Sequence, residues 1–403
     1  MRPHYQTVRF FRRVGVFLGL KIHIVPASKL DPADYPQLDK TPPIDSPEVQ
    51  QWIKDVQNSG VTIPDIAPTV PPGGCGGANA EAAADPSRCW WTCTGCLADD
   101  DVTFCPDKLT WGLTYDDGPD EWTGDLLSYL DSVDLKTTFF IVGSRAISYP
   151  AILQEEYMAE HQLGVHTWSH PYMTTLSNEQ IIAELGWTKE VIKNATGVTP
   201  TFWRPPFGDV DNRVRAIATA MGLRTSMWTS VNGSTFDTEG TSVLHSGTLR
   251  HMLNTIRAVT SDWQIPAGQS VYEVLNNWES IVTRATEIDT GFIVLEHDLY
   301  QQTVDVATGY ILPDALAHQP PFKIEPIISC IGRPLADAYA ETNGTAPAAN
   351  SSSTSTTGSS TNTGSGSASA SETASSGAAR SLPASLASSI VGMGVVIVAA
   401  LML

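Results

Sequence analysis

Residues Trp111–Asp120 read WGLTYDDGPD and join a short apolar run to an abrupt acidic turn. The apolar run is typical of a buried strand. Gly118 permits a backbone turn that other residues resist, and Pro119 cannot continue a strand ladder. Asp116 and Asp117 are therefore predicted at the carboxyl end of this strand, with their side chains on opposite sides of the chain.

The two adjacent carboxylates of this stretch need a cationic partner. They repel one another unless a cation lies nearby, and a bound metal ion is a common solution. A solvated Asp-Gly turn is the simpler alternative, and Asp116 and Asp117 alone do not exclude it. The rest of the sequence has to decide between these two interpretations.

Strand-like and helix-like segments alternate between Cys105 and Cys330. The expected strands cover residues 111–115, 137–142, 163–166, 201–204, 224–228 and 291–296. The expected helices cover residues 123–132, 149–160, 177–195, 213–221 and 271–286. This alternation predicts an α/β fold with parallel strands and crossover helices. About six or seven such repeats favour a barrel, in which functional groups lie at the carboxyl ends of the strands.

The N-terminal third of the chain has features of a secreted protein. Arg12 and Arg13 precede an apolar run at Val14–Leu20, which is the order of a secretory signal peptide, so residues 1–27 are predicted to form one. A short membrane-surface segment is the alternative. Residues 28–105 are predicted to form an N-terminal extension that is first Pro-rich and loosely packed and then Cys-rich.

The C-terminal part of the sequence is predicted to be a stalk followed by an anchor signal. Residues 333–376 become rich in Ser, Thr, Gly and Ala, a composition that cannot bury a core. Small residues, a polar spacer and the apolar segment Leu386–Leu403 follow, which is the order of a GPI-attachment signal. We expect this signal at residues 377–403, with attachment at Ser376. A membrane-spanning helix, which needs about 20 apolar residues, is the alternative.

Six cysteines are expected in an oxidising compartment, where they form disulfides. Five of them cluster in residues 75–105, so Cys330 is expected to pair back to this cluster, with the partner left open. A zinc site at the CxxxCxxC run lacks a completing Cys or His pair at suitable spacing. Asn-x-Ser/Thr sequons predict glycosylation at Asn194, Asn232, Asn343 and Asn350. The net charge of −19 argues against nucleic-acid binding, because nucleic acids select basic surfaces.

A pair of histidines follows the expected strand at residues 163–166. His166 and His170 are four residues apart in HTWSH, so they can face the same way on a helical turn and bind one metal ion. Two surface histidines are the alternative. Together with Asp117, they would form a set of three protein ligands with an open position for water, as catalytic zinc requires.

Two further polar groups follow expected strands. Arg204 in RPPFG can hold a carboxylate in a bidentate grip, and the backbone N–H of Phe207 could donate to a developing oxyanion. A structural ion pair is the alternative for Arg204. His297 in EHD can donate a proton to a leaving amine near neutral pH. A buried, hydrogen-bonded histidine is the alternative there.

Taken in order, these segments resemble the motifs of the NodB-homology polysaccharide deacetylases, and among them the fungal chitin deacetylases. TYDDGP resembles the first motif, HTWSH the second, RPPFG the third and VLEHDLY the fifth. The resemblance covers residues 107–328 and implies a deacetylase domain at residues 106–332 with a distorted (β/α) barrel. It also implies a metal-dependent enzyme, with Zn2+, Co2+ or Mn2+, that removes N-acetyl groups from chitin or partly acetylated chitosan.

The resemblance assigns a role to each matching residue. Asp116 is the expected general base, Arg204 its partner and His297 the general acid. The expected metal ligands are Asp117, His166 and His170. The expected sugar-binding residues are Asp116, Phe207, Trp228 and Phe236. The protein is expected to be monomeric and to lie at the cell surface, held by a GPI anchor or released to the wall.

The fourth family motif, DxxDW, has no identical counterpart directly after residues 224–228. Asn232 and Phe236 have the spacing of its first Asp and its Trp, but neither residue is identical. Because the family's Asp orients the acid histidine, we expect a lowered pKa for His297, unless Asp237 or Asp298 replaces the missing partner.

The departure in the fourth motif also leaves other functions open. One alternative is a wall carbohydrate-binding protein that has kept the pocket but lost turnover. A second is a deacetylase or esterase that acts on another acetylated polysaccharide, such as xylan.

Overall fold

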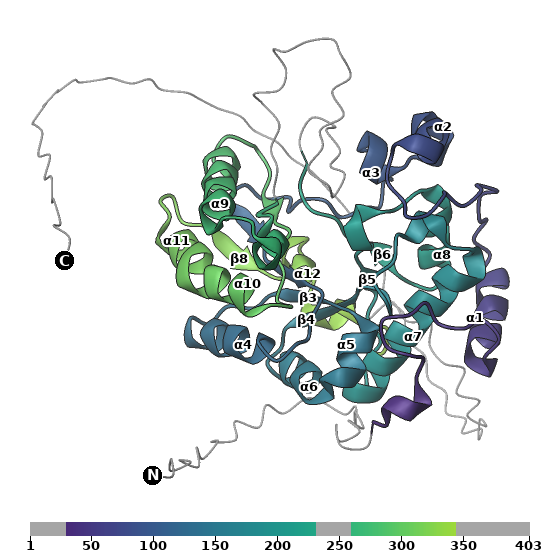
Figure 1. Ribbon diagram of the computed structural model, residues 1–403. Helices are drawn as coiled ribbons and strands as arrows, with labels where there is room; N and C mark the ends of the chain where they lie inside the picture. The colour runs from purple at the N-terminus through teal and green to yellow at the C-terminus, as the bar shows by residue number, and fades with distance from the viewer. Residues whose placement is uncertain (1–29, 231–258, 344–403) are drawn as a thin grey trace, which may run out of the picture. The chain divides into compact units, whose positions relative to one another are not determined.

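The computed structural model describes residues 30–230 and 259–343 (Figure 1). Within these residues every pairing between two strands is parallel. One sheet contains, in order, β2 (Thr114–Asp116), β3 (Thr138–Ile141), β4 (Gln162–Val165), β5 (Phe202–Trp203) and β6 (Arg224–Thr225). The other contains β7 (Phe292–Ile293), β1 (Thr110–Gly112) and β8 (Lys323–Glu325).

Backbone hydrogen bonds join the two sheets into a distorted barrel. On one side of β7, the N–H of Asp116 donates to the carbonyl of Glu296 at 2.9 Å, and Asp116 forms a parallel bridge with His297. On the other side, the N–H of Thr229 donates to the carbonyl of Ile293 at 3.0 Å. The predicted α/β barrel is therefore confirmed. The sequence did not predict β8, because its three residues form no apolar run.

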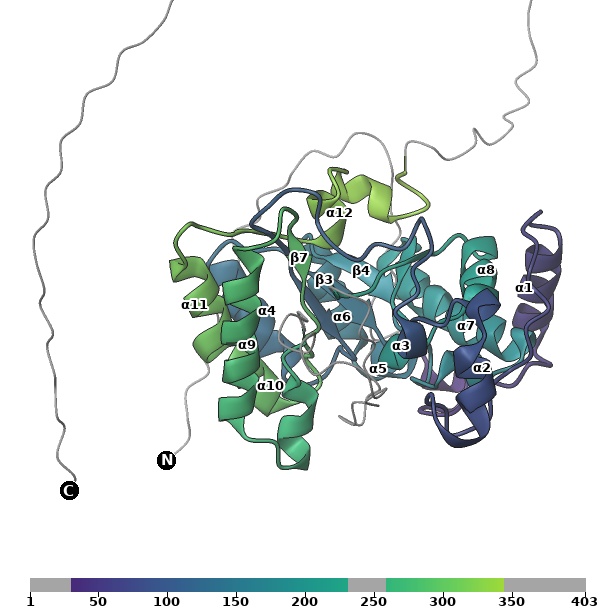
Figure 2. The same ribbon diagram turned by 90° about the horizontal axis from the view of Figure 1, so that it is seen from above.

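Helices connect the strands and lie outside them (Figures 1 and 2). The longer ones match the predicted ranges closely: α4 (Thr123–Ser132), α6 (Pro150–Met158), α7 (Asn178–Thr196), α8 (Asn212–Ala220) and α9 (Val271–Ala285). The predicted capping box at Ser177 begins α7, and Gly197, with φ 83°, ends it. Six α-helices of the described residues were not predicted, because each is too short to show a period: α2 (Ala80–Ala84), α3 (Trp91–Thr94), α5 (Gly143–Ser148), α10 (Gln301–Val306), α11 (Leu312–Ala317) and α12 (Ile327–Cys330).

The described part of the N-terminal extension packs tightly, contrary to the expected loose packing. Its helix α1 (Pro47–Gln57) lies on α7, and Val49 is fully buried. The Trp52 ring meets Trp187 edge-on at 5.4 Å, and a Cβ at Gly186 would lie 2.2 Å from Trp52. Val49, Trp52 and Val56 recur at helical spacing, so a helix near residues 47–58 is expected from the sequence, but its packing against α7 is not.

Three disulfides account for all six cysteines. Cys105–Cys330 joins the first strand region of the barrel to α12, so Cys330 does pair back to the cluster. Cys75–Cys93 and Cys89–Cys96 lie in the extension, next to α2 (Ala80–Ala84) and α3 (Trp91–Thr94). Disulfides, rather than a zinc site, therefore explain the CxxxCxxC run.

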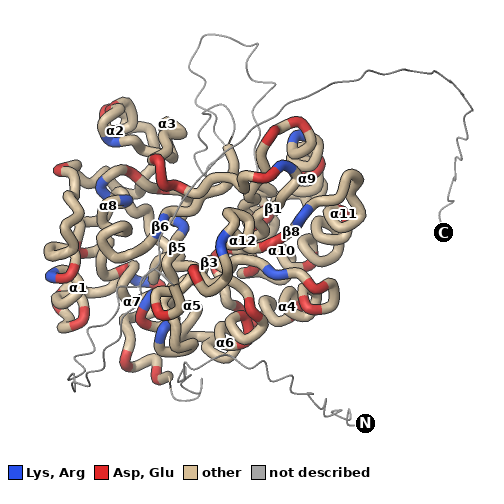
Figure 3. The backbone as a smooth tube through the Cα atoms, turned by 180° about the vertical axis from the view of Figure 1, so that it is seen from behind, with Lys and Arg blue, Asp and Glu red and all other residues tan. Residues whose placement is uncertain are grey.

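Acidic residues are spread over many elements of the described chain (Figure 3). No helix in residues 30–230 or 259–343 is long and apolar enough to cross a membrane.

Candidate active site

The predicted site residues meet at the carboxyl ends of the strands. Asp116 is the last residue of β2, and Asp117 leaves the strand with φ 79°. This left-handed backbone turns the Asp117 side chain back toward the site. His166 Nε2 consequently lies 3.3 Å from Asp117 Oδ1 and 3.8 Å from Asp116 Oδ2. The expectation that the two carboxylates point to opposite sides is therefore wrong, because Asp117 does not keep strand geometry.

The three predicted metal ligands form a cluster. Asp117 Oδ1 lies 3.1 Å from His170 Nε2, and one ligand atom from each residue lies within 4.8 Å of the other two. Burial opposes ionisation of Asp117, but the imidazoles of His170 and His166 hold the pKa of its carboxyl well below its usual range. The cluster thus offers one carboxylate and two imidazoles, the donors that zinc prefers.

The hydrogen bonding of this cluster, as well as its set of donor atoms, fits a bound metal ion. Asp117 Oδ1 is buried, yet it makes no hydrogen bond of acceptable geometry among the described residues. His166 Nδ1 lies 2.8 Å from the carbonyl of Arg204, which favours a proton on Nδ1 and leaves Nε2 free to ligate. A cation bound between these atoms would satisfy the orphaned carboxylate oxygen.

The loop that carries both histidines (the histidine loop, residues 166–175) is fixed by a buried carboxylate from α7. Glu184 Oε2 accepts the N–H groups of Trp168 and Ser169 at 2.8 Å each, and Oε1 accepts the Ser169 hydroxyl at 2.5 Å. His170 itself has φ 58°. Strained backbone of this kind persists only where the surroundings hold it, and it is common at functional sites.

Asp116 has a different partner from Asp117. Arg204 Nη1 donates to Asp116 Oδ1 at 2.8 Å and to the Thr114 hydroxyl at 2.8 Å. Both charged side chains are buried, and the Arg204 guanidinium lies 4.3 Å from the centre of the Phe140 ring. The predicted Asp116–Arg204 pair is present, and it leaves Asp116 Oδ2 directed toward the metal-ligand cluster.

Phe207 lies between the metal cluster and an aromatic neighbour. It has φ 58°, its ring stacks on Tyr172 at 4.2 Å, and it meets the His170 ring edge-on at 4.6 Å. Its backbone N–H donates no hydrogen bond to another described residue. Trp228 is 5 % exposed and its ring meets Trp91 edge-on at 4.8 Å, and its role in binding sugar stays a prediction.

The partner of His297 is a residue that the sequence reasoning missed. His297 Nδ1 lies 2.8 Å from Asp262 Oδ1, and Asp262 Oδ2 accepts the His297 backbone N–H at 2.9 Å. Burial disfavours the charged imidazole, but Asp262 outweighs it and raises the pKa of His297 to about 9. The predicted lowering of this pKa is therefore wrong, because His297 does have a carboxylate partner.

Asp262 and Trp263 correct our placement of the fourth motif. Trp263 lies 5.2 Å from the His297 ring, so Asp262-Trp263 takes the place of the DW pair in DxxDW, with Val259 in place of the first Asp. The motif was expected directly after β6, whereas the Asp-Trp pair lies further along the chain, at residues 262–263. The Asp-Trp dipeptide itself was the signal that could have found it. Asp298, the other proposed partner, instead accepts the Thr123 hydroxyl at 2.6 Å.

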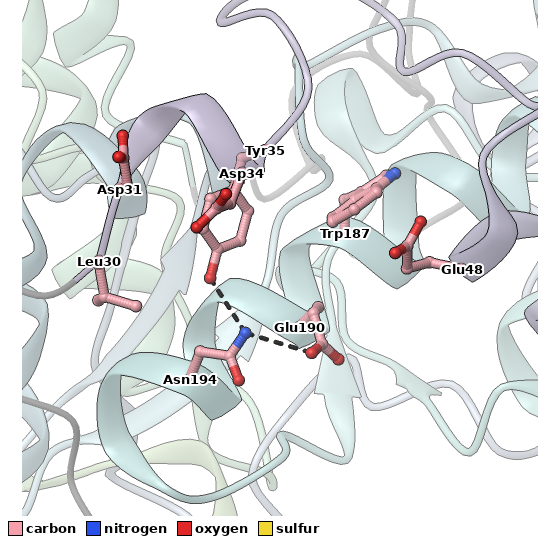
Figure 4. A pocket seen from close by; sticks show the side chains of 8 residues that line it. All are labelled: Leu30, Asp31, Asp34, Tyr35, Glu48, Trp187, Glu190 and Asn194. Atoms are coloured by element: carbon pink, nitrogen blue, oxygen red, sulfur yellow. Dashed lines mark hydrogen bonds between the residues drawn. The ribbon is translucent and has the colours of Figure 1, made fainter.

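The remaining predicted positions have mixed outcomes. Asn194 lies in α7, where its Nδ2 donates to the Tyr35 hydroxyl at 3.0 Å and to Glu190 at 3.2 Å (Figure 4). These bonds occupy the amide that a glycan would use. Asn343 is the last described residue. The other predicted positions lie outside the described residues: Asn232, Phe236, Asp237, Asn350 and Ser376.

Comparison with known proteins agrees with this site. Residues 104–226 match the family model described as polysaccharide deacetylase. This match covers strands β2, β4 and β5, at whose carboxyl ends Asp116, Asp117, His166, His170 and Arg204 lie.

Curated relatives make the resemblance more specific. The chain is 47% identical over 327 residues to chitin deacetylase 1 of Cryptococcus neoformans var. grubii, covering 79% of this chain and 63% of that protein. It is 34% identical over 254 residues to a chitin deacetylase of Amylomyces rouxii, covering 57% of this chain and 53% of that protein. This chain therefore spans less than two thirds of the length of either relative.

A solved structure, that of the chitin deacetylase from Colletotrichum lindemuthianum, is similar with a TM-score of 0.48 and 22% sequence identity. The match covers 59% of this chain and 94% of that one.

The contact between His297 and Asp262 predicts a titration effect. In Asp262→Asn, His297 loses the carboxylate that favours its charged form while its burial remains, so its pKa should fall from about 9 to 6.5 or below. NMR titration of the imidazole in chelator-treated protein measures this change. Asp289→Asn, which removes an exposed carboxylate, is the control. An unchanged His297 pKa in Asp262→Asn would contradict the assignment.

Proposed function

We propose that this protein is a metal-dependent N-deacetylase that converts N-acetylglucosamine units of chitin into glucosamine units and acetate. The observation that carries the proposal is the separation of roles between two adjacent carboxylates. Asp117 belongs to the cluster with His166 and His170, whereas Asp116 is held by Arg204. Hydrolysis assisted by a metal needs such a division between ligand and base.

We infer that the ion at Asp117, His166 and His170 is Zn2+, with Co2+ or Mn2+ as possible substitutes. When bound, a divalent cation of this kind acidifies water and polarises a carbonyl group. Asp117, His166 and His170 would hold such an ion with three protein ligands, which would leave a position open as catalytic zinc requires. The Asp117 Oδ1 atom without a hydrogen bond among the described residues, and the His166 Nε2 left free by the bond at Nδ1, support this assignment.

The protein side chains supply the proton transfers. Asp116 is placed to accept a proton from the water that attacks the acetamide carbon, and Arg204 fixes its orientation. The Phe207 N–H can donate to the carbonyl oxygen as that oxygen gains negative charge. His297, with a pKa of about 9, is charged at neutral pH and can protonate the amine as the C–N bond breaks.

The substrate assignment comes from the relatives rather than from the geometry of the site. Chitin is named in the curated relatives described above, and partly acetylated chitosan or another acetylated polysaccharide stays an alternative substrate. The Asp262–His297 pair weakens the competing proposal of a carbohydrate-binding protein without turnover, because that proposal depended on a missing carboxylate.

The proposed metal ligands predict the metal content of variants. His170→Ala should lose the bound metal or retain it at least about tenfold more weakly, because two ligands cannot hold the ion as three do. Elemental analysis after dialysis measures the metal content. His318→Ala, which removes a half-buried histidine outside the cluster, should keep the metal. Stoichiometric metal in His170→Ala would refute the ligand set.

The proposed division of roles predicts the behaviour of Asp116→Asn. This variant should retain metal but release acetate from chitin oligomers about 10²–10⁴-fold more slowly, because it lacks the base and not a ligand. Acetate release by wild type and variant, each with and without chelator, measures the effect. If wild type releases no acetate from chitin oligomers, the proposed function is wrong. If Asp116→Asn is as fast as wild type, only the role of Asp116 is wrong.

Residues 333–343 pack on the barrel, where Tyr339 is buried and its hydroxyl bonds the backbone of His161 and Leu163, so the expected start of the stalk at residue 333 is wrong. We also propose that residues 344–403 attach the protein to the cell surface through a GPI anchor. The Ser/Thr-rich composition, the small residues near Ser376 and the apolar segment support this. A phosphatidylinositol-specific phospholipase should then release the protein from membranes. Peptides from Leu386–Leu403 in the mature protein would instead support a membrane-spanning tail.

A further inference from the structure

The N-terminal extension reaches two loops of the active site. One is the histidine loop, residues 166–175. The other is the arginine loop, residues 204–211, which carries Arg204 and Phe207. The barrel strands place the start of each loop, but each loop continues beyond its strand. The positions of Phe207 and of the residues after His170 therefore depend on further contacts.

A buried carboxylate, Asp209, connects these two loops with the extension. Its Oδ2 accepts the backbone N–H and the hydroxyl of Thr174, both at 2.8 Å. Its Oδ1 accepts the indole N–H of Trp90 at 2.7 Å. Asp209, Thr174 and Trp90 are all fully buried. One side chain of the arginine loop thus bonds both the histidine loop and the extension.

The extension holds the arginine loop at three successive residues. The Thr92 hydroxyl donates to the carbonyl of Gly208 at 2.9 Å, and the Trp91 N–H donates to the carbonyl of Val210 at 3.0 Å. The Trp91 ring lies directly against Gly208, where a Cβ would be 2.3 Å from Cζ3 of Trp91. Gly208 immediately follows Phe207, so these contacts fix the backbone that presents the Phe207 N–H.

A second part of the extension holds the histidine loop. The Thr69 N–H donates to the carbonyl of Thr174 at 2.9 Å, and the hydroxyls of the two residues lie 2.8 Å apart. Gly73 lies against the Tyr172 ring, which in turn stacks on Phe207. The extension therefore contacts both loops, on either side of the place where Phe207 meets His170.

The disulfides and an arginine keep the Trp90 segment in place. Cys75–Cys93 and Cys89–Cys96 close around residues 90–92. Arg215 from α8 donates to the carbonyls of Cys89 and Cys96 at 2.7 and 3.1 Å. The segment is thus attached to the barrel independently of its bonds to the arginine loop.

We propose that residues 69–96 act as a brace that sets the position of the Phe207 amide relative to the metal ligands, with Trp90 and Thr92 as positioning residues. The inference rests on the proposed deacetylase function for its effect on turnover. The Phe207 N–H contributes only if it points at the developing oxyanion, and a small displacement of such a donor is costly. Neither Trp90 nor Thr92 contacts the metal ligands, so the brace acts on turnover rather than on metal binding.

Trp90→Phe tests the brace, because it removes the indole N–H bonded to Asp209. Its kcat for acetate release should fall about tenfold or more, with KM and Zn2+ affinity within about threefold of wild type. Hydrogen–deuterium exchange in residues 204–211 should be about tenfold faster. Thr92→Val, which removes only a hydroxyl, should show both effects and guards against failure of the Trp90 variant to fold.

Trp111→Phe is the matched control, since Trp111 is equally buried but its indole N–H has no partner among the described residues. This control should retain the wild-type kcat and the wild-type rate of hydrogen–deuterium exchange in residues 204–211. Unchanged exchange in both Trp90→Phe and Thr92→Val would overturn the brace whatever the activity. Faster exchange with unchanged kcat would overturn the positioning role. Absence of acetate release by wild type would overturn the proposed function, and the exchange data would still decide whether the brace exists.

Discussion

The left-handed backbone of Asp117 is the constraint on which the site depends. In a regular strand, two successive side chains point to opposite faces, and one carboxylate would leave the site. With φ 79°, Asp117 turns back, so both carboxylates reach His166. Such a conformation costs on the order of 1–3 kcal/mol and persists because its surroundings enforce it. Gly118 allows this turn, since a Cβ there would lie 2.4 Å from Asp298.

Separate partners keep the adjacent negative charges of Asp116 and Asp117 from repelling one another. Arg204, buried in the barrel, neutralises Asp116, and the imidazoles face Asp117. His297 follows β7 and forms a parallel bridge with Asp116, and Asp262 favours the charged form of its imidazole. The barrel brings these groups together because parallel strands place their carboxyl ends at one rim.

Most of this arrangement could be predicted from the sequence, because strand ends and short motifs are local features. The sequence predicted the barrel and the positions of His166, His170 and Arg204. Asp262 was missed because its contact with His297 joins segments that are 35 residues apart in the chain. The backbone reversal at Asp117 and the packing of residues 69–96 depend on tertiary contacts, which neither periodicity nor composition reveals.

The most direct test of the account is the position of the metal in the zinc-loaded protein, located by anomalous diffraction at the zinc edge. The account predicts one zinc ion at about 2.0–2.2 Å from Asp117 Oδ1 and from Nε2 of His166 and His170, with Asp116 still paired to Arg204. A zinc ion bound directly by Asp116, or bound away from these two histidines, would contradict the account.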